Sequence, residues 1–493
     1  MRMILDANSL EDYKRFLQIK QLPHYQFEGN TAIFPDEYAN RLNETVEKPP
    51  AIDYEPIDGL FDYQEDIMRL AISKRKFSVF ADCGLGKTLM MLEFARHVCK
   101  QIPSNKCILI VSPLMVIPQT ISEAKRFYGG SYSIEQVRAS RLKDWLTSGK
   151  GQIGITNYEA LRDDVEQGRL AGLILDESSM LKSHYGKHGT KCIELGKGLD
   201  WKLALTGTPA PNDRIEYANH AVFMDAYPTI NSFLARFFVN RGQTSNRWEL
   251  KKHASSPFYV ALSHWCIFLT NPATYGWSDG CKNVPPMHVH LHDVPLTSEQ
   301  QDIISSETDG FFVMDIGGIT SRSKLSQISK GYYKGKKFPT NKPAFIRKLI
   351  DSWPDESTII WCLYNEEQRL IAKWFPEAAS ISGDTPNDER MRMIADFKVG
   401  RTKILISKPK ILGFGLNLER ASRQVFSGLQ DSYESFYQAV KRSNRYGATR
   451  PLNVHIPATE AERPMIQTVL TKMHRVEQDT IEQERLFKRG SLL

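Results

Sequence analysis

The sequence has few cysteines and no long hydrophobic run. Only 7 of its 493 residues are cysteines and none forms a CxxC pair, so neither a disulfide framework nor a zinc ribbon is expected. The longest apolar stretch, residues 107–118, is interrupted by Ser112 and Pro113 and is too short to cross a bilayer. The first residues contain no apolar segment of the signal-peptide type. We therefore expect a soluble, cytoplasmic protein with no membrane partner.

Repeats and low-complexity tracts are also absent from the sequence. Hydrophobic residues make up 41% and charged residues 25%, which excludes a wholly disordered chain. Residues 1–66 carry 6 basic and 14 acidic side chains; because the whole chain has a net charge of +7, the remainder carries +15. A basic body fits a polyanionic partner, although many ordinary enzymes are equally basic.

Apolar strands alternate with helices in two stretches of the chain. Such runs are typical of parallel sheets covered on both faces, so we predict an α/β fold with two parallel-sheet domains. The strands expected in these stretches are residues 77–80, 107–111, 152–156, 173–175, 202–205, 358–363, 379–382, 402–407, 424–428 and 452–456. The predicted segments are a small α+β module with a helix over 10–20 and a hairpin about Gly29-Asn30 (1–50), a first sheet domain (51–215), a mostly helical insertion or linking region (216–300), a second sheet domain (301–457) and a C-terminal helical brace (458–493).

A glycine-rich turn follows the first of these strands and opens a helix. Residues 81–88 read ADCGLGKT, with Ala81 where a strict P-loop has its first glycine. Glycines allow the backbone N–H groups to approach phosphates, and the helix N-terminus adds the positive end of its dipole. Lys87 would contact the β and γ phosphates of ATP, and the Thr88 hydroxyl would bind Mg²⁺. A chance glycine-rich turn is the alternative. The predicted nucleotide-binding residues are Gly84, Leu85, Gly86, Lys87 and Thr88.

Two carboxylates follow another apolar strand, Leu173–Leu175. Ligands bind at the carboxyl ends of strands in parallel sheets. Asp176 would hold Mg²⁺, directly or through water, and Glu177 would orient and polarise the water that attacks ATP. Two acids after a strand are also common surface chemistry, but a position 89 residues after Lys87, with strands between, favours the catalytic interpretation.

Basic side chains occur at two further places that could meet phosphate. Arg442 and Arg445 would share one face of a helix, and their permanent charge suits a γ-phosphate in the transition state. Residues 233–252 place Arg236 and Arg247 among aromatic side chains, a combination that can contact phosphate and stack on bases. The alternative for the arginine pair is a solvated basic face. The alternative for residues 233–252 is that the aromatic side chains form core and the charged side chains are solvated.

Together these strings resemble the motor of helicase superfamily two, and more closely its SWI/SNF-type branch of double-stranded DNA translocases. The resemblance covers about residues 61–460, with the motifs in the family's order. The further strings that carry it are Tyr63-Gln64, Ile110–Leu114, Ile155–Tyr158, Leu205–Asn212, Ser382-Gly383 with Glu389-Arg390, Gly413–Leu418 and Gln438–Gly447. It implies two tandem RecA-like domains with ATP and Mg²⁺ as cofactors.

The resemblance also implies roles for single residues. Gln64 would read adenine, because a carboxamide both donates and accepts hydrogen bonds. The residues that would act around the nucleotide or in catalysis are Gly415, Gln438, Arg442 and Arg445, the two arginines as finger residues. Those that would bind nucleic acid are Pro113, Thr156, Asn157, Thr206 and Asn417.

Some strings depart from the family's pattern. Ser179 stands where the acidic motif often ends in histidine, and Ser407–Leu412 replaces the expected Thr-Lys-Ala-Gly-Gly. The glutamine that usually ends the arginine motif is absent after Gly447. The N-terminal module has a weaker similarity, through Phe16–Pro23 and Phe34-Pro35, to the HARP-type module beside some annealing helicases; a packing module that caps the motor is the alternative.

The resemblance implies an ATP-driven translocase on double-stranded or branched DNA, with low sequence specificity, in replication, recombination or repair. RNA is a less favoured partner. A strand-separating DNA or RNA helicase is one alternative. A nucleic-acid-binding module that uses ATP only as a switch is another, although Glu177 and the two arginines argue against it. We find no chromatin-reading domain or nuclease cluster, so a compact bacterial or phage-type enzyme fits better than a chromatin remodeller.

Overall fold

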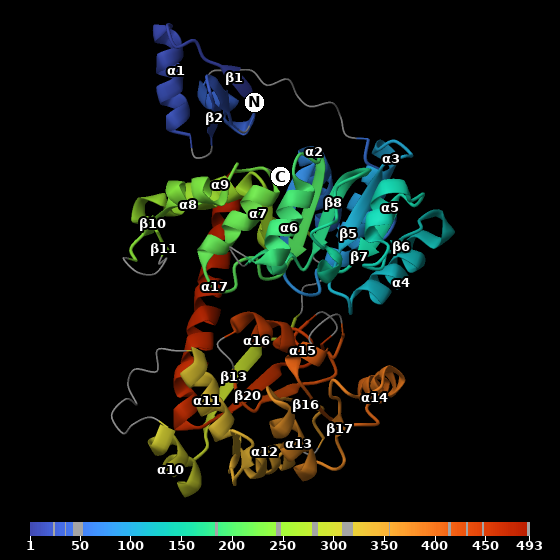
Figure 1. Cartoon of the computed structure of the whole chain (residues 1–493), viewed down its shortest axis with the longest axis vertical. Coiled ribbons are helices and arrows are strands. Elements are labelled where there is room, and N and C mark those ends of the chain that lie inside the picture. Colours follow the sequence, from blue (N-terminus) through green and yellow to red (C-terminus); the bar gives the residue numbers. More distant parts are fainter. Residues whose placement is uncertain are drawn as a thin grey trace. The chain divides into compact units, whose positions relative to one another are not determined.

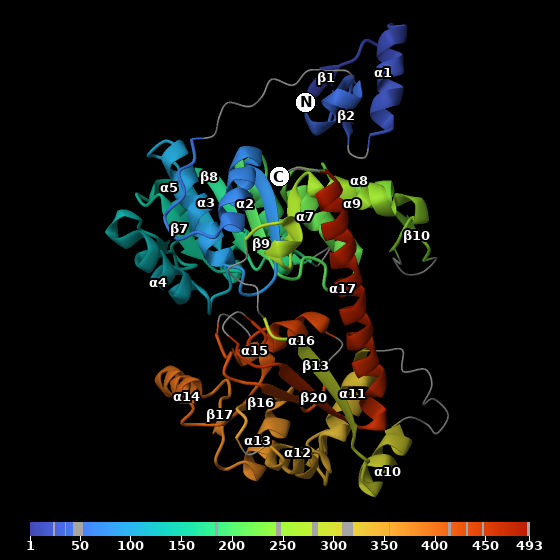
Figure 2. The same cartoon turned by 180° about the vertical axis from the view of Figure 1, so that it is seen from behind.

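Figure 1 shows the chain as a computed structural model, and Figure 2 shows it from behind. The structure describes residues 1–22, 25–34, 36–42, 53–182, 186–242, 248–278, 284–307, 319–353, 355–412, 416–429, 432–445 and 448–490. The chain forms two compact units, the first from Met1–Gly280 with Gln478–Leu493 and the second from Cys281–Glu477. Within the described ranges, no helix is long and apolar enough to span a bilayer.

The first unit is built on a seven-stranded sheet, with every neighbouring pair of strands parallel. Its order is β12-β4-β9-β8-β5-β7-β6. The strands are β4 (Lys76–Ala81), β5 (Cys107–Val111), β6 (Glu135–Gln136), β7 (Ile153–Thr156), β8 (Leu170–Asp176), β9 (Trp201–Thr206) and β12 (Cys266–Leu269). Every residue of β5 and β9 is buried, which explains their continuous apolar sequences.

Helices cover this sheet (Figures 1 and 2), and α3 contacts three of its strands, β5, β8 and β9. The helices of the unit are α2 (Asp62–Lys74), α3 (Lys87–Gln101), α4 (Ile117–Tyr128), α5 (Leu142–Ser148), α6 (Lys187–Gly196), α7 (Tyr217–Phe223), α8 (Ile230–Phe237) and α9 (Ser255–Ser263). A short hairpin, β10 (Phe238–Asn240) with β11 (Trp248–Leu250), follows α8. The aromatic side chains Phe233, Phe237 and Phe258 are at most 1% exposed, so in this region the aromatics form core.

The N-terminal module has its own small antiparallel sheet, in the order β1-β3-β2. The helix predicted over residues 10–20 is confirmed as α1 (Leu10–Lys20), which begins at Ser9 because the Ser9 hydroxyl accepts a hydrogen bond from the Asp12 N–H. The predicted hairpin is also confirmed, and Gly29 at its turn has φ +57°. The strands are β1 (Arg2–Ile4), β2 (Gln26–Glu28) and β3 (Thr31–Ile33).

The second unit is built on a six-stranded parallel sheet, in the order β13-β20-β19-β16-β18-β17. Its strands are β13 (Met287–Asp293), β16 (Thr358–Trp361), β17 (Ala379–Ser380), β18 (Ile404–Ser407), β19 (Arg423–Phe426) and β20 (Leu452–Ala458). Ile359 and Trp361 of β16 belong to one hydrophobic core, while Ile360 and Cys362 belong to another. Since neighbouring strand residues point to opposite faces, this sheet is covered on both faces.

The helices of this unit are α10 (Ser298–Glu307), α11 (Ile319–Ser329), α12 (Lys342–Asp351), α13 (Asn365–Trp374), α14 (Asn387–Val399), α15 (Pro409–Leu412) and α16 (Tyr433–Val440). A small hairpin joins β14 (Tyr332–Tyr333) to β15 (Lys336–Lys337). The predicted long C-terminal helix is α17 (Arg463–Gly490). Its Ile466 and Val469 pack in a core of the second unit, while residues from Gln478 onward belong to the first.

Four strands lie where the sequence predicted a mostly helical linking region, residues 216–300: the β10–β11 hairpin and two strands at the edges of the large sheets. β12 is the edge strand of the first sheet beside β4, and β13 is the edge strand of the second sheet beside β20. Their signals are weak: β12 has four residues, and β13 reads MHVHLHD, an alternation whose polar members are imidazoles. Helices α7, α8 and α9 account for the predicted helical character.

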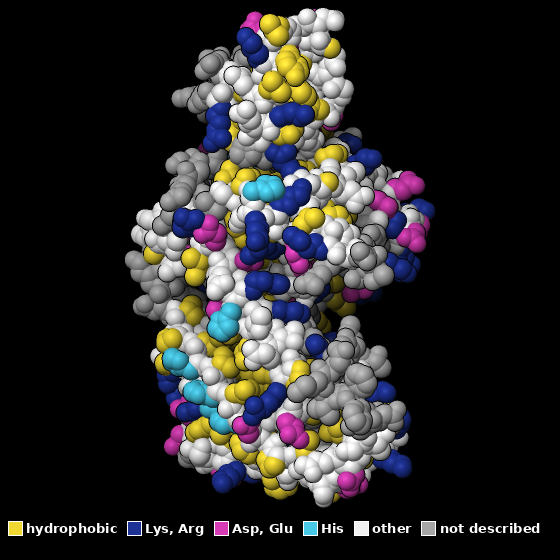
Figure 3. Space-filling model, turned by 90° about the vertical axis from the view of Figure 1, so that its left-hand side faces the viewer, with side chains coloured by type: hydrophobic (Ala, Val, Ile, Leu, Met, Phe, Trp, Pro, Cys, Tyr) yellow, Lys and Arg dark blue, Asp and Glu magenta, His cyan; other side chains and the backbone are white. Residues whose placement is uncertain are grey.

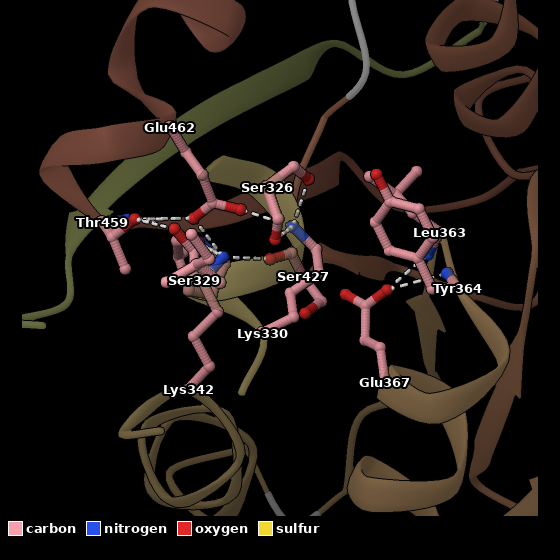
Figure 4. A network of polar contacts seen from close by, with 12 residues as sticks. Ser326, Ser329, Lys330, Lys342, Leu363, Tyr364, Glu367, Ser427, Thr459 and Glu462 are labelled. Atoms are coloured by element: carbon pink, nitrogen blue, oxygen red, sulfur yellow. Dashed lines mark hydrogen bonds and ion pairs between the residues drawn. The ribbon is translucent and has the colours of Figure 1, made fainter. Parts of the chain in front are cut away.

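A buried ion network ties together the second unit (Figure 4). The Glu462 carboxylate is fully buried and lies 2.5 Å from both the Lys330 and the Lys342 ammonium groups. Burial alone would raise the pKa of Glu462, but the two ammonium groups outweigh burial and lower it to about 2. Lys342 also donates to the carbonyl of Ser427, after β19, and to that of Pro457 in β20, the latter at 3.0 Å.

Candidate functional site

The glycine-rich turn joins β4 to the N-terminus of α3. Gly84 and Gly86 have φ of +92° and +70°, in the left-handed region that favours glycine. A β-carbon on Gly86 would lie 2.1 Å from the amide nitrogen of Gln64, so a larger residue here would have to displace the Gln64 side chain. The first N–H groups of α3 have no partner inside the helix, and this end of the helix carries its positive partial charge. The turn therefore offers the donors that a phosphate needs.

Lys87, the first residue of α3, reaches back over this turn. Its ammonium donates to the carbonyls of Ala81 at 2.8 Å and Asp82 at 3.2 Å. These are neutral acceptors, which the oxygens of a polyphosphate can replace with stronger, charge-assisted bonds. Thr88 follows in the same helical turn and is partly exposed.

The two predicted carboxylates, like the glycine-rich turn, lie at the carboxyl ends of the strands. In the ladders, Phe80 of β4 pairs with Thr206 of β9, and Asp176 of β8 pairs with Leu205. The carboxyl ends of these parallel strands are thus in register. The predicted spatial relation between the glycine-rich turn and the acidic pair agrees with this register.

Asp176 is only 7% exposed and has two donors. The Ser112 hydroxyl donates to one oxygen at 2.8 Å, and the Glu177 N–H donates to the other at 3.0 Å. Burial, and then the neighbouring Glu177 carboxylate, raise the pKa of Asp176 to about 6, against the opposing effects of Ser112 and Lys87. Each oxygen keeps a lone pair, and a buried carboxylate of raised pKa gains from a bound cation. The Asp176 carboxylate therefore suits a bound cation such as Mg²⁺.

Glu177 has a strained backbone, with φ +48° and ψ +51°. A left-handed conformation costs a residue with a side chain about 1–3 kcal/mol, and such strain concentrates at functional sites. The turn is held from behind by Tyr158, whose hydroxyl donates to the carbonyl of Asp176 at 2.6 Å. Tyr158 is fully buried, and the sequence analysis gave it no role of its own.

Gln64 also lies at the glycine-rich turn, where its carboxamide bonds main-chain groups. It is 3% exposed; its nitrogen donates to the Leu85 carbonyl at 3.3 Å, and its oxygen accepts from the Phe61 N–H at 3.0 Å. The Tyr63 hydroxyl donates to the same Leu85 carbonyl at 3.2 Å. The role of Gln64 in reading adenine stays a prediction.

The arginine motif lies in the second unit, and its local structure differs from the prediction. Helix α16 ends at Val440, so Arg442 and Arg445 occupy the following turn instead of one helix face. Arg442 is 6% exposed and Arg445 is half-buried. Gln438 lies on α16 and is half-buried, whereas Gly415 lies outside the described residues.

Gln424 of β19, which the sequence analysis did not single out, fixes this turn. Its carboxamide nitrogen donates to the Ser443 hydroxyl at 2.8 Å and to the Ala439 carbonyl at 3.1 Å. Its oxygen accepts from the indole N–H of Trp361 at 3.0 Å. Gln424 is fully buried, so the arginine turn is tied to the centre of the second sheet.

The residues predicted to bind nucleic acid differ in exposure. Thr156 and Thr206 are fully buried; Thr156 donates to the Val137 carbonyl at 2.7 Å, and the Thr206 hydroxyl accepts from the Thr208 N–H at 3.1 Å. Neither side chain reaches the surface, so a contact with nucleic acid would have to come from the main chain, and their assignment as nucleic-acid-binding residues stays a prediction. Those that are half-buried and partly accessible are Pro113, Asn157 and Asn417.

In the predicted basic and aromatic surface of residues 233–252, Arg236 has two contacts with the N-terminal module, and its role in nucleic-acid binding stays a prediction. The Arg236 guanidinium donates to the Leu22 carbonyl at 2.8 Å and lies 4.3 Å from the centre of the Tyr25 ring. It therefore fastens the N-terminal module to α8. Arg247 lies outside the described residues. Figure 3 shows Lys and Arg side chains gathered on one face of the molecule.

Two family models match this chain. Residues 71–347 match the SNF2-related domain, and residues 341–447 match the helicase conserved C-terminal domain. "Putative protein p41" of Acyrthosiphon pisum secondary endosymbiont phage 1 is 24% identical over 433 residues, which are 80% of this chain and 91% of that protein.

Two eukaryotic relatives are much longer than this chain. "ATP-dependent DNA helicase DDM1" of Arabidopsis thaliana is 22% identical, over 76% of this chain and 55% of that protein. "DNA annealing helicase and endonuclease ZRANB3" of Mus musculus is also 22% identical, over 80% of this chain and 38% of that protein. The chain thus spans about half, or less, of these relatives. A solved structure, "Sulfolobus solfataricus SWI2/SNF2 ATPase core in complex with dsDNA", has 20% identity and a TM-score of 0.41, covering 90% of this chain and 97% of its own.

The SNF2-related domain covers more than half of the chain, and it is followed by the helicase C-terminal domain. The expected family and the expected fold of two parallel-sheet domains are confirmed. This chain belongs to the SNF2-related family of helicase superfamily two, and it is an ATP-hydrolysing enzyme of the helicase and translocase class.

Proposed function

We propose that this enzyme is an ATP-driven translocase that moves along double-stranded or branched DNA with low sequence specificity. The observation that carries the proposal is that Lys87, Asp176 and Glu177 lie together at the carboxyl ends of strands in the first sheet. An ATP-hydrolysing motor needs these residue types in this arrangement. Two relatives are DNA helicases by name. Phosphate contacts carry no sequence information, so we expect strong salt dependence and little preference among sequences.

In the first unit, each residue has a separate task. The N–H groups of residues 84–88 bind the phosphates, and Lys87 exchanges the carbonyls of its own loop for phosphate oxygens. Thr88 and Asp176 would hold Mg²⁺, which neutralises charge on the phosphates. Glu177 orients the attacking water, because the strained turn fixes the backbone from which its carboxylate extends.

The second unit would supply positive charge to the transition state. Arg442 and Arg445 are permanently charged, and their turn is anchored by Gln424. We propose that ATP binding brings these arginines to the γ-phosphate and that hydrolysis releases them. Each cycle would then advance one unit along the DNA backbone. Arginine fingers typically contribute about 10³–10⁵ in rate.

The test is the steady-state ATPase rate with a panel of nucleic acids: none, single-stranded DNA, duplex, forked DNA and RNA. Duplex or forked DNA should stimulate hydrolysis more than single strands or RNA, and raising the salt concentration should abolish the stimulation. Stimulation mainly by single strands or RNA would contradict the proposal and favour a strand-separating helicase. ATP binding without hydrolysis under any condition would indicate a nucleotide switch.

A further inference from the structure

The chain is fastened to α2 at the point where it leaves the first unit. The Trp277 indole N–H donates to the Asp66 carboxylate at 2.7 Å. The Ser278 N–H and hydroxyl both donate to one oxygen of Asp62, each at 2.7 Å. Ser278 is the last described residue before the boundary of the unit at Gly280. Three hydrogen bonds to two carboxylates, one helical turn apart, thus hold the exit segment.

The same turn of α2 holds the nucleotide loop. Tyr63 and Gln64, which directly follow Asp62, both donate to the Leu85 carbonyl, at 3.2 and 3.3 Å. Both side chains are almost completely buried, and Gln64 fills the space beside Gly86. Three consecutive residues of α2 therefore make both sets of contacts: Asp62 accepts from the exit segment, and Tyr63 and Gln64 donate to the nucleotide loop.

Aromatic rings join the two sets of contacts. The Tyr63 ring lies 6.3 Å from the Trp277 ring, and the Trp277 ring lies 5.2 Å from the Tyr275 ring, measured between centres. The Tyr275 hydroxyl donates to the Phe268 carbonyl of β12 at 2.6 Å, which holds the exit segment on the edge of the sheet. The three rings form a series of neighbours, in which only Tyr63 is fully buried. A shift at Leu85 has a continuous route through Tyr63 to Trp277.

We propose that these contacts, here named the α2 clamp (Asp62, Tyr63, Gln64, Asp66, Trp277 and Ser278), couple the nucleotide loop to the segment that connects the two units. Trp277 and Ser278 are positioning residues of the motor reaction, acting through α2 rather than on ATP. The inference rests on the proposed function only where DNA is concerned. Polyphosphate binding at residues 84–88 shifts the Leu85 carbonyl, α2 follows, and the exit segment moves or tightens with it.

Hydrogen exchange of the full chain tests the coupling without DNA. The chain is compared with and without a non-hydrolysable ATP analogue and Mg²⁺, and the Ser278 amide is the reporter because it donates to Asp62. We expect its exchange rate to change by about tenfold or more when the nucleotide loop becomes protected. In the double variant Trp277→Phe/Ser278→Ala, the loop should still become protected while the exit segment no longer responds. Protection of the loop without any response at residues 275–278 of the natural chain would overturn the proposal.

ATPase kinetics separate this proposal from the proposed function. The double variant should keep the KM for ATP and the DNA-free rate within about twofold, and lose about five- to tenfold of the DNA-stimulated kcat. The matched control is Trp374→Phe/Ser352→Ala, because Trp374 is 45% exposed and the Ser352 hydroxyl donates to the Leu349 carbonyl of its own helix. A variant equal to the natural enzyme under DNA stimulation would contradict the coupling. Absence of stimulation in the natural enzyme would contradict the DNA function, and the exchange experiment would still decide on the coupling.

Discussion

The carboxamide nitrogen of Gln64 lies 2.1 Å from the position that a β-carbon on Gly86 would take. One residue of α2 is therefore packed closely against one residue of the nucleotide loop. Gln64 also donates to the neighbouring Leu85 carbonyl, so its side chain contacts two consecutive residues of the loop.

Gly86→Ala should abolish ATP binding, because the new methyl group must displace Gln64 and because φ of +70° strains alanine. Fluorescent-nucleotide titration measures the affinity. The matched control is Gly198→Ala, whose φ is +76° but whose β-carbon would meet nothing within 4 Å. The control should lose about 1 kcal/mol of stability and bind ATP normally. Normal affinity in Gly86→Ala would refute the steric argument.

Arg445→Ala should lower kcat for ATP at least about 10³-fold while leaving nucleotide affinity nearly unchanged, because an arginine finger acts in the transition state. Single-turnover hydrolysis and equilibrium nucleotide binding provide the two readouts. Arg401→Ala is the control, since Arg401 is 78% exposed in a surface ion pair with Asp396. A loss of affinity equal to the loss of rate would show that Arg445 binds the ground state instead.

Glu462→Gln should destabilise the second unit by about 3–5 kcal/mol, because it leaves Lys330 and Lys342 buried without their counter-charge. Its folded-state pKa of about 2 lies below the ordinary value of 4.5, so its stabilising effect is present above pH 4.5 and is lost as the pH falls towards 2. Urea unfolding at several pH values measures both effects. The exposed neighbour Glu460→Gln should change neither.

His455 should make the second unit sensitive to mild acid. Its ring contacts those of His292 and His290, and the Arg423 guanidinium lies 3.3 Å from its Nε2. Burial, and then repulsion from these groups, lower the pKa of His455 to about 3. The unfolded chain takes up this proton near pH 6.5 and the folded chain does not, so stability falls as the pH drops from 6.5 towards 3.

Thermal unfolding between pH 7.5 and 4.5 measures this effect. His455→Phe should flatten the dependence of Tm on pH over this range, since phenylalanine has no proton to take up. His474→Gln should leave it unchanged, because that imidazole is 69% exposed. An unchanged slope in His455→Phe would assign the acid sensitivity to other groups.

The residues that could be predicted are those whose neighbours are local in sequence. The glycine-rich turn and the Asp176-Glu177 pair are each fixed by a strand that ends beside them, and parallel pairing brings these ends together. Helix α1 has its own cap at Ser9. In each case, the signal lies within a few residues of the element that it defines.

What could not be predicted depends on distant partners. Arg236 looked free to meet phosphate, but its acceptor, the Leu22 carbonyl, is 214 residues away. Trp277 is 211 residues from Asp66. Helix α16 ends at Val440 without a glycine or proline to mark the start of the arginine turn. Gln424, which holds this turn, lies on a strand whose composition is that of an ordinary core strand.

The most direct measurement is displacement of a third DNA strand from a triplex on a blunt duplex, with ATP and with Lys87→Ala beside the natural enzyme. Displacement that requires ATP hydrolysis, and that Lys87→Ala lacks, is the predicted result, because a motor that travels on the duplex removes the third strand without separating the other two. Lys143→Ala, a lysine 61% exposed in the same unit, should behave like the natural enzyme. Hydrolysis stimulated by the duplex with no displacement of the third strand would contradict translocation.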